Sequence, residues 1–96
     1  MDQVTVTHHG NDQKGEYRAH VAGTQAIGRL TWVLRNGARV ADHTLVPAEI
    51  GGRGVAGKLV NALIADARGQ GFRIVPSCSY VAAQFNRHPD WADLLA

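Results

Sequence analysis

The chain of 96 residues contains a single cysteine, Cys78, and therefore cannot form an internal disulfide. Small secreted domains often depend on several such bonds, so this shortage points to a reducing compartment. The sequence also lacks an apolar run near the roughly 18 residues that read as a membrane span, and its first residues lack the apolar core of a signal peptide. We therefore expect a cytoplasmic protein with no membrane partner.

Charge of either sign is also sparse. Charged residues make up 19% of the chain, and ten Lys and Arg against eight Asp and Glu leave a net charge of +2. Eight of the ten cations are arginines, which suit phosphate groups, but they are scattered and do not form the cluster typical of nucleic-acid binding. We therefore expect no nucleic-acid partner and favour a single anionic small molecule.

The histidines offer no pattern for a metal ion. His8 and His9 are adjacent, so their side chains should point to opposite sides of a strand, and His20 stands at no ligand spacing from either. One cysteine cannot complete a structural zinc site. No metal is expected.

What the chain does contain is an ordinary globular composition. Hydrophobic residues reach 45%, well above the level of disordered chains. The length suits one small domain over residues 1–96, without repeats. Any function must therefore be built on one small core, in which we expect Tyr17 and Trp32 to pack.

The first half of the chain has the pattern of β-strands. Apolar and polar residues alternate, with β-branched residues among them, and this predicts strands over residues 4–8, 16–21, 25–35 and 38–46. The dipeptide Asn36-Gly37 is typical of a tight hairpin turn because both residues tolerate a positive φ. Short turns between successive strands predict an antiparallel meander of four strands.

The second half changes to a helical period. From Val55 onward, apolar residues recur every three or four positions, and Gly69 and Gly71 are placed to end this helix. A short buried strand over residues 72–75 should follow and end at Pro76. The crossover favours a strand parallel to residues 38–46.

The last part of the chain predicts further helix. Ser77 or Ser79 is suited to cap a helix that runs to about Arg87, where His88 and Pro89 break it. The whole chain is therefore expected to be an α+β protein, a mixed α/β sandwich. Its order is a four-strand antiparallel meander, a helix, one strand parallel to the fourth, and C-terminal helices.

Glycines are concentrated between the fourth expected strand and the long helix. Residues 49–58 match both the dinucleotide pattern GxGxxG and most of a phosphate loop. Neither match fits, because the preceding strands are antiparallel and because Leu59 stands where a phosphate loop needs Ser or Thr. The feature that both motifs share remains: backbone N–H groups, a helix N-terminus and Arg53 could hold a diphosphate. A flexible turn is the alternative.

Three segments resemble one family. Residues 42–60 resemble the acetyl-coenzyme A binding motif of the GNAT superfamily of N-acetyltransferases: Gln or Arg, two residues, Gly, one residue, then Gly or Ala. Residues 75–80 and 87–94 are similar to its smallest, single-domain members. These share a His-Thr-x-Val-Pro strand end, a Pro-x-Cys after the next strand and a His-Pro-x-aromatic near the C-terminus. The resemblance covers residues 16–96.

The resemblance implies a cofactor, acetyl-coenzyme A, and a place for it. Two parallel strands, ending at Val46 and Val75, would separate at their ends and admit the pantetheine arm. The residues implied to contact the cofactor are Leu45, Val46, Arg53, Gly54, Val55, Ala56, Gly57, Lys58, Asn86 and Arg87. Gly51 departs from the motif because Gln or Arg is usual there, and Arg53 is a candidate to compensate for the missing side chain.

Two residues could carry the chemistry. Cys78 lies just before a predicted helix, where the helix dipole favours the thiolate. It could accept the acetyl group or protonate the departing sulfur, and a buried structural cysteine is the alternative. His43 lies on the strand that leads to the cofactor and could act as a general base, or else be a solvent-facing or core histidine. Strand alternation places His43 and Leu45 on one face and Thr44 and Val46 on the other.

The resemblance therefore implies an acetyl-coenzyme A-dependent N-acetyltransferase that acts on an unidentified primary amine, in a small molecule or a peptide. An acyl-coenzyme A-binding module with little or no turnover is the alternative, since a chain this short leaves little for an acceptor pocket. A small basic nucleic-acid binder is a weaker third reading. We expect a monomer or a weak homodimer, because the edge strand over residues 4–8 could pair between copies.

Overall fold

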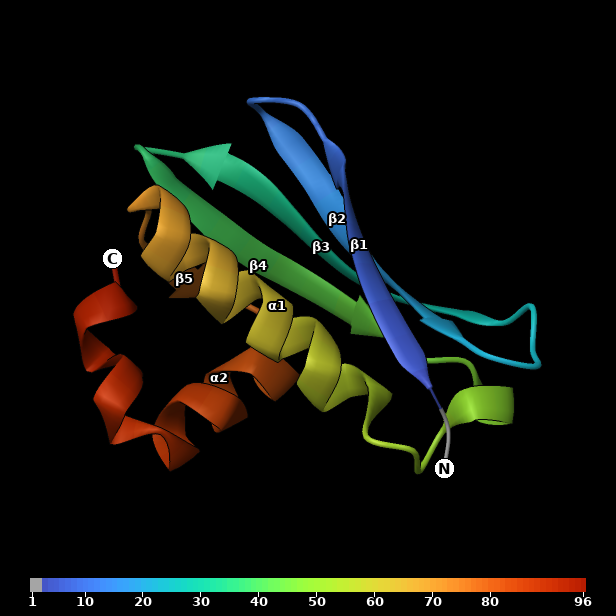
Figure 1. The fold of residues 1–96 in the computed structure, drawn as a ribbon. Helices are drawn as coiled ribbons and strands as arrows, with labels where there is room; N and C mark the ends of the chain where they lie inside the picture. The colour runs from blue at the N-terminus through green and yellow to red at the C-terminus, as the bar shows by residue number, and fades with distance from the viewer. Residues whose placement is uncertain (1–2) are drawn as a thin grey trace.

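The computed structural model describes residues 3–96. It contains a five-stranded sheet, two α-helices and two short 3-10 helices (Figure 1). The strands are β1 (Val4–Gly10), β2 (Lys14–Val21), β3 (Ile27–Arg35), β4 (Ala38–Leu45) and β5 (Ile74–Pro76). The helices are η1 (Ala48–Ile50), α1 (Val55–Gln70), α2 (Ser79–Arg87) and η2 (Pro89–Leu94).

The sheet has the order β1-β2-β3-β4-β5, so each strand lies beside its neighbour in sequence. The first four strands are antiparallel, and β5 pairs with β4 in parallel after the α1 crossover. The predicted α+β meander with one parallel strand is therefore confirmed. The hairpin turn is also confirmed, because Asn36 and Gly37 have φ of 51° and 79°.

Several predicted boundaries were wrong by a few residues. The first hairpin is longer than expected: β1 runs to Gly10 and β2 begins at Lys14. Its short loop is held by Asn11, whose side-chain oxygen accepts hydrogen bonds from the backbone N–H groups of Gln13 and Lys14. These bonds stabilise a tight turn in a segment whose polar composition had suggested a longer loop.

Helix α1 packs its apolar stripe on the sheet. Its buried residues are Val55, Leu59, Val60, Leu63, Ile64 and Ala67. Each large aliphatic side chain withdrawn from water in this way contributes about 1.5–3 kcal/mol to stability. Gly71 ends the helix in the left-handed conformation, with φ of 81°. Gly69 lies inside the helix, so its prediction as a stop was wrong.

The cap predicted for α2 was also wrong. Cys78 occupies the cap position, and neither Ser77 nor Ser79 makes a side-chain cap. The helix does end at Arg87, and η2 follows at Pro89. Trp91 of η2 stacks on His88 with ring centroids 3.9 Å apart.

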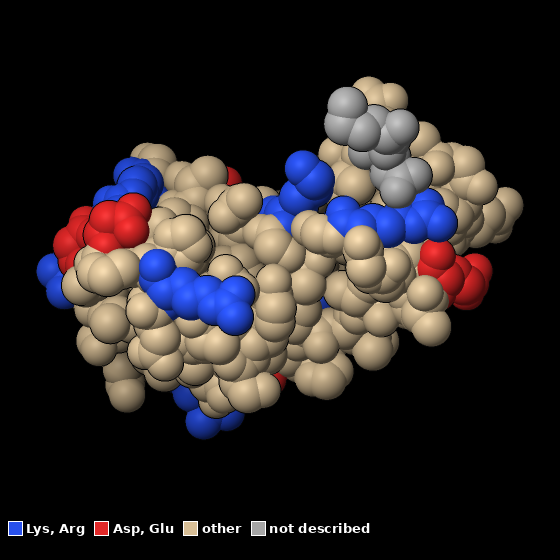
Figure 2. Space-filling model, turned by 90° about the horizontal axis from the view of Figure 1, so that it is seen from below, with Lys and Arg blue, Asp and Glu red and all other residues tan. Residues whose placement is uncertain are grey.

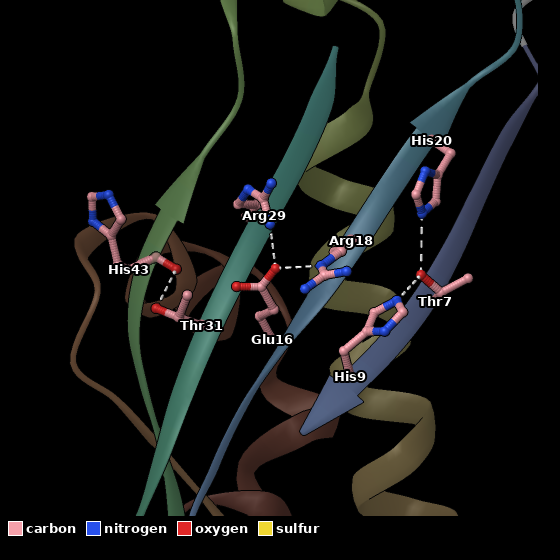
Figure 3. Close-up of polar contacts among 8 residues, drawn as sticks. All are labelled: Thr7, His9, Glu16, Arg18, His20, Arg29, Thr31 and His43. Carbon is pink, nitrogen blue, oxygen red and sulfur yellow. Dashed lines mark hydrogen bonds and ion pairs between the residues drawn. The ribbon is translucent and has the colours of Figure 1, made fainter. Parts of the chain in front are cut away.

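The two faces of the sheet differ sharply. Tyr17 and Trp32, each 1% exposed, belong to the core that α1, α2 and η2 cover, as predicted. Alternate residues on the same strands, such as Glu16, Arg18 and Thr31, stand on the opposite face. Figure 3 looks onto this second face with the helices behind it; it is called the open face below.

Candidate active site

The parallel pairing between β4 and β5 is short. It joins Arg39 with Ile74, Val40 with Val75 and Ala41 with Pro76. Immediately after it, the backbone N–H of Cys78 donates to the carbonyl of Ala41 at 2.8 Å. The chain then turns into α2, while β4 continues to Leu45 beside β3 alone. The two strands therefore part at their C-terminal ends, and this parting is called the β4–β5 split.

A bulge lies in β4 where the split begins. Trp32 of β3 pairs with Ala41, but the preceding Thr31 pairs with His43, so Asp42 is an extra residue. Ala41 is fully buried on the helix side. Asp42 and His43 are both exposed in succession, and Asp42 accepts a hydrogen bond from the Thr31 hydroxyl at 2.6 Å. The bulge thus moves His43 to the open face.

Cys78 lies against the other side of β4. Its Sγ is 3.4 Å from the hydroxyl oxygen of Thr44, the residue after His43. Partial burial of the thiol raises its pKa, but hydrogen bonds from Thr44 and from the backbone at Val81 and Tyr80 outweigh this effect, so the pKa of Cys78 is lowered. The sulfur is therefore predisposed to give up its proton.

His43 and Cys78 consequently lie on opposite sides of the same strand segment. The predicted alternation holds here, since His43 and Leu45 are exposed whereas Thr44 and Val46 are partly buried. Figure 3 shows His43 at the edge of the open face, next to Thr31. The two candidate catalytic residues thus face the split from its two sides and do not form a hydrogen-bonded pair of the kind found in a triad.

The glycine-rich segment forms an ordered turn. Ile50 of η1 is fully buried and anchors it to the core. Gly52 and Gly54 then take positive φ of 74° and 73°, which glycine adopts at little cost. Gly54 is also the N-cap of α1, so no side chain caps this helix. The N-terminus of α1 is therefore open to an anion, beside the exposed Arg53 and Lys58.

A glycine in β3 sets how closely α1 approaches the sheet. A Cβ on Gly28 would lie 2.9 Å from Cγ1 of Val55 and 3.4 Å from Cδ1 of Leu59. The absence of a side chain at Gly28 therefore lets the first turn of α1 pack directly on the strand. Our sequence reading did not single out this residue.

Helix α2 contacts α1 near the N-terminus of α1. The Tyr80 hydroxyl of α2 lies 3.8 Å from where a Cβ would stand on Gly57 of α1. Tyr80 therefore belongs to the surroundings of the candidate site, although the sequence reading did not choose it. Asn86 and Arg87 are exposed in the last turn of α2, so their predicted contact with a cofactor stays a prediction.

Other classes of site find less support. Among residues 3–96, no three His, Cys, Asp or Glu side chains lie together in a way that could hold a metal ion. Within the same residues, no helix is long and apolar enough to cross a membrane. Figure 2 shows Lys and Arg in separate groups on the face seen from below, with Asp and Glu beside some of them.

A known protein family matches this chain. The model of the GCN5-related N-acetyltransferase domain matches residues 16–94, which is most of the chain. The chain belongs to the GCN5-related N-acetyltransferase family. The match spans β2 to η2 and includes the glycine turn, the split and both candidate catalytic residues.

Members of this acetyltransferase family generally use acetyl-coenzyme A, and the described residues suit it. A diphosphate needs backbone donors and positive charge, which the uncapped α1 N-terminus and the neighbouring cations offer. Gly52 and Gly54 have nothing within 4 Å of a Cβ position, so the turn has room on its outer side. Beyond Ala41, β4 pairs with β3 but no longer with β5, so its second edge is available to an extended arm.

Proposed function

We propose that this protein is an acetyl-coenzyme A-dependent N-acetyltransferase that acetylates a primary amine. The observation that carries the proposal is the β4–β5 split. His43 lies on one side of it, and Cys78, which is hydrogen-bonded to Thr44, lies on the other. The family match supports acetyl transfer in general. The opposed placement supports a division of proton transfers between the two residues.

The proposed cofactor seat runs from the α1 N-terminus to the split. Backbone N–H groups of Gly54, Val55, Ala56 and Gly57 would hold the diphosphate, with Arg53 and Lys58 adding charge. Leu45 and Val46 would offer backbone partners to the pantetheine arm, and Asn86 and Arg87 are proposed to contact the nucleotide end. When bound, coenzyme A supplies the acetyl group as a reactive thioester.

His43 acts as the general base in this proposal. It accepts a proton from the amine as the amine nitrogen forms its bond to the acetyl carbon. A neutral imidazole has one ring nitrogen that can accept a proton. Its exposed position on the open face leaves it accessible to an incoming amine.

Cys78 acts as the general acid. It donates its proton to the sulfur released as the carbon–sulfur bond breaks, and hydrogen bonds from Thr44 and the α2 backbone stabilise the thiolate that it becomes. His43 then releases its extra proton to solvent, and Cys78 takes up one proton from solvent, so that both residues return to their starting states. Direct transfer fits the opposed placement, since the amine arrives from the open face and Cys78 lies on the helix side.

Binding and turnover test separate parts of the proposal. Isothermal titration should show one coenzyme A per chain, and Arg53→Ala should weaken binding about tenfold. Gly51→Arg should strengthen it, because Gly51 has an ordinary φ of −68° and the atom nearest to a Cβ there would be the Ala48 carbonyl oxygen, at 3.4 Å. An unchanged dissociation constant in Arg53→Ala would rule out compensation by this residue.

The role of Cys78 is tested by intact mass. Incubation with acetyl-coenzyme A should leave the protein unmodified while amine acetylation proceeds. A gain of one acetyl group that disappears in Cys78→Ala would instead support covalent transfer. Tight binding without acetylation of any amine would favour the binding module. We also propose that the protein acts in the cytoplasm, where a free Cys78 stays reduced.

A further inference from the structure

The open face carries a groove that the proposed chemistry does not by itself explain. Its volume is about 420 Å³, which suits a small metabolite or the end of a peptide. The residues that line it come from four neighbouring strands and include His9, Lys14, Glu16, Arg18, Thr31 and Asp42. It therefore crosses the sheet from β1 to β4.

The strand pairing shows where this groove leads. His9 pairs with Glu16, Glu16 with Thr31, and Thr31 with His43, so these four residues form one row across the sheet. Figure 3 shows all four on the open face. The row ends on β4 at the bulge, beside the β4–β5 split. A molecule lying in the groove would thus have one end at Asp42, the residue before His43.

The β4 end of the groove is negatively charged. Asp42 is the charged residue of β4 that lines it, and the Thr31 hydroxyl fixes this carboxylate by a hydrogen bond of 2.6 Å. Because the bulge places Asp42 next to His43, a carboxylate and the candidate base stand side by side in sequence on one face. This end suits the ammonium form of an amine substrate, which must release one proton to solvent before its nitrogen can attack.

The part of the groove over β2 is positively charged. Glu16 accepts hydrogen bonds from Arg18 and Arg29, and these contacts cancel its charge. The bond from Arg18 is the largest cause of a lowered pKa at Glu16; partial burial opposes it and Arg29 adds to it, so the glutamate stays ionised. Lys14, on the same side of β2 as Glu16 and Arg18, then leaves this part with excess positive charge.

From this arrangement we propose that the groove binds the acetyl acceptor, and that the acceptor is an amine bearing a carboxylate or similar acid group. The ammonium lies at Asp42 and the acid group lies toward Lys14 and Arg18. Neighbouring strands are about 4.8 Å apart, so the charges on β2 and β4 are about 10 Å apart. An acidic peptide N-terminus or a lysine-sized amino acid spans this distance. The inference rests on the proposed acetyltransferase function.

A matched pair of acceptors tests the acid end. Nα-acetyl-lysine and its methylamide share the same amine, but only the first has a carboxylate. Nuclear magnetic resonance titration of each into the full chain at low salt should show about fivefold tighter binding of the carboxylate form. Lys14→Gln should remove this preference. Arg35→Gln, which removes a charge from the end of β3 outside the groove, should retain it.

Asp42→Asn tests the amine end. An asparagine oxygen can still accept the Thr31 hydroxyl, so the bulge should survive. Both compounds should bind about fivefold more weakly. Equal binding of the two compounds to the unmodified chain, or retention of the preference in Lys14→Gln, would overturn the acid end of the proposal. Unchanged binding in Asp42→Asn would overturn the amine end.

These titrations contain no coenzyme A, so they fail independently of the proposed function. Acetylation of amines without a preference for the carboxylate form would leave the acetyltransferase intact and refute the groove. In contrast, selective binding of Nα-acetyl-lysine with no coenzyme A affinity would refute the transferase and leave the groove as a binding site.

Discussion

Residues 39–41 of β4 are paired with β3 on one side and are joined to β5 or its flanking residues on the other, whereas residues 42–45 run beside β3 alone. The first part holds the fully buried Ala41, and the second holds the exposed Asp42 and His43. One continuous strand thus changes from core to site at the bulge. Pairing with β5, more than residue type, therefore separates the structural part of β4 from the candidate functional part.

The largest expected effect lies in the unpaired part. His43→Gln should lower kcat about 100-fold at pH 7, because general-base assistance typically contributes at least this much. The free energy of unfolding, measured in urea, should not change noticeably, since His43 is exposed. A variant with full activity would remove His43 from the mechanism.

The paired part should respond in the opposite way. Ala41→Leu adds three carbons to a residue with no exposed surface, and overpacking of this kind costs about 2 kcal/mol of stability. Urea unfolding measures this loss. Asp42→Asn, one residue away, should change stability by less than about 0.5 kcal/mol. Equal losses in the two variants would contradict the division of the strand.

Much of this division could not be predicted from sequence. Alternation correctly places His43 and Leu45 opposite Thr44 and Val46, and the glycine turn and long helix follow from spacing. Strict alternation, however, would also put Ala41 on the same face as His43, because the two are two residues apart. The bulge at Asp42 depends on the register with β3, and no local residue pattern specifies that register.

Contacts between distant segments were also hidden. Thr44 meets Cys78 across 34 positions, and Gly28 receives the first turn of α1 from 27 positions away. The sequence alone offers no signal for the contact between Thr44 and Cys78. A Gly within a strand pattern suggests that something packs closely against it, but not which segment. Residues named through the family resemblance, such as Arg53, could be found because the motif carries them.

A moderate effect is expected at the start of α1. Gly54→Ala forces a side chain into a left-handed conformation, which costs about 1 kcal/mol. The strain should reduce stability by this amount and also weaken coenzyme A binding, because it disturbs the helix start. Gly52→Ala has a similar φ but lies before the cap, so it should reduce stability alike and affect binding less. Urea unfolding measures the stability of each variant, and isothermal titration calorimetry measures its dissociation constant for coenzyme A.

The smallest expected effect concerns the thiol itself. Thr44→Val removes the side-chain hydrogen bond that helps to lower the pKa of Cys78, so the pKa should rise. An acid must be protonated to act, and its rate falls as pH rises through its pKa. The falling limb of the pH profile should therefore move to higher pH. Movement of a rising limb instead would mark Cys78 as a nucleophilic thiolate.

The extra residue at Asp42 reverses which face of the sheet each later side chain of β4 points to. If that residue were deleted, the side chain at every later position of the strand would point to the opposite face of the sheet. His43 would then enter the apolar interior, and Thr44 would swing into solvent and leave the sulfur without its partner. A single lost codon could in this way erase both proton-handling groups while every amino acid that bears them is still encoded.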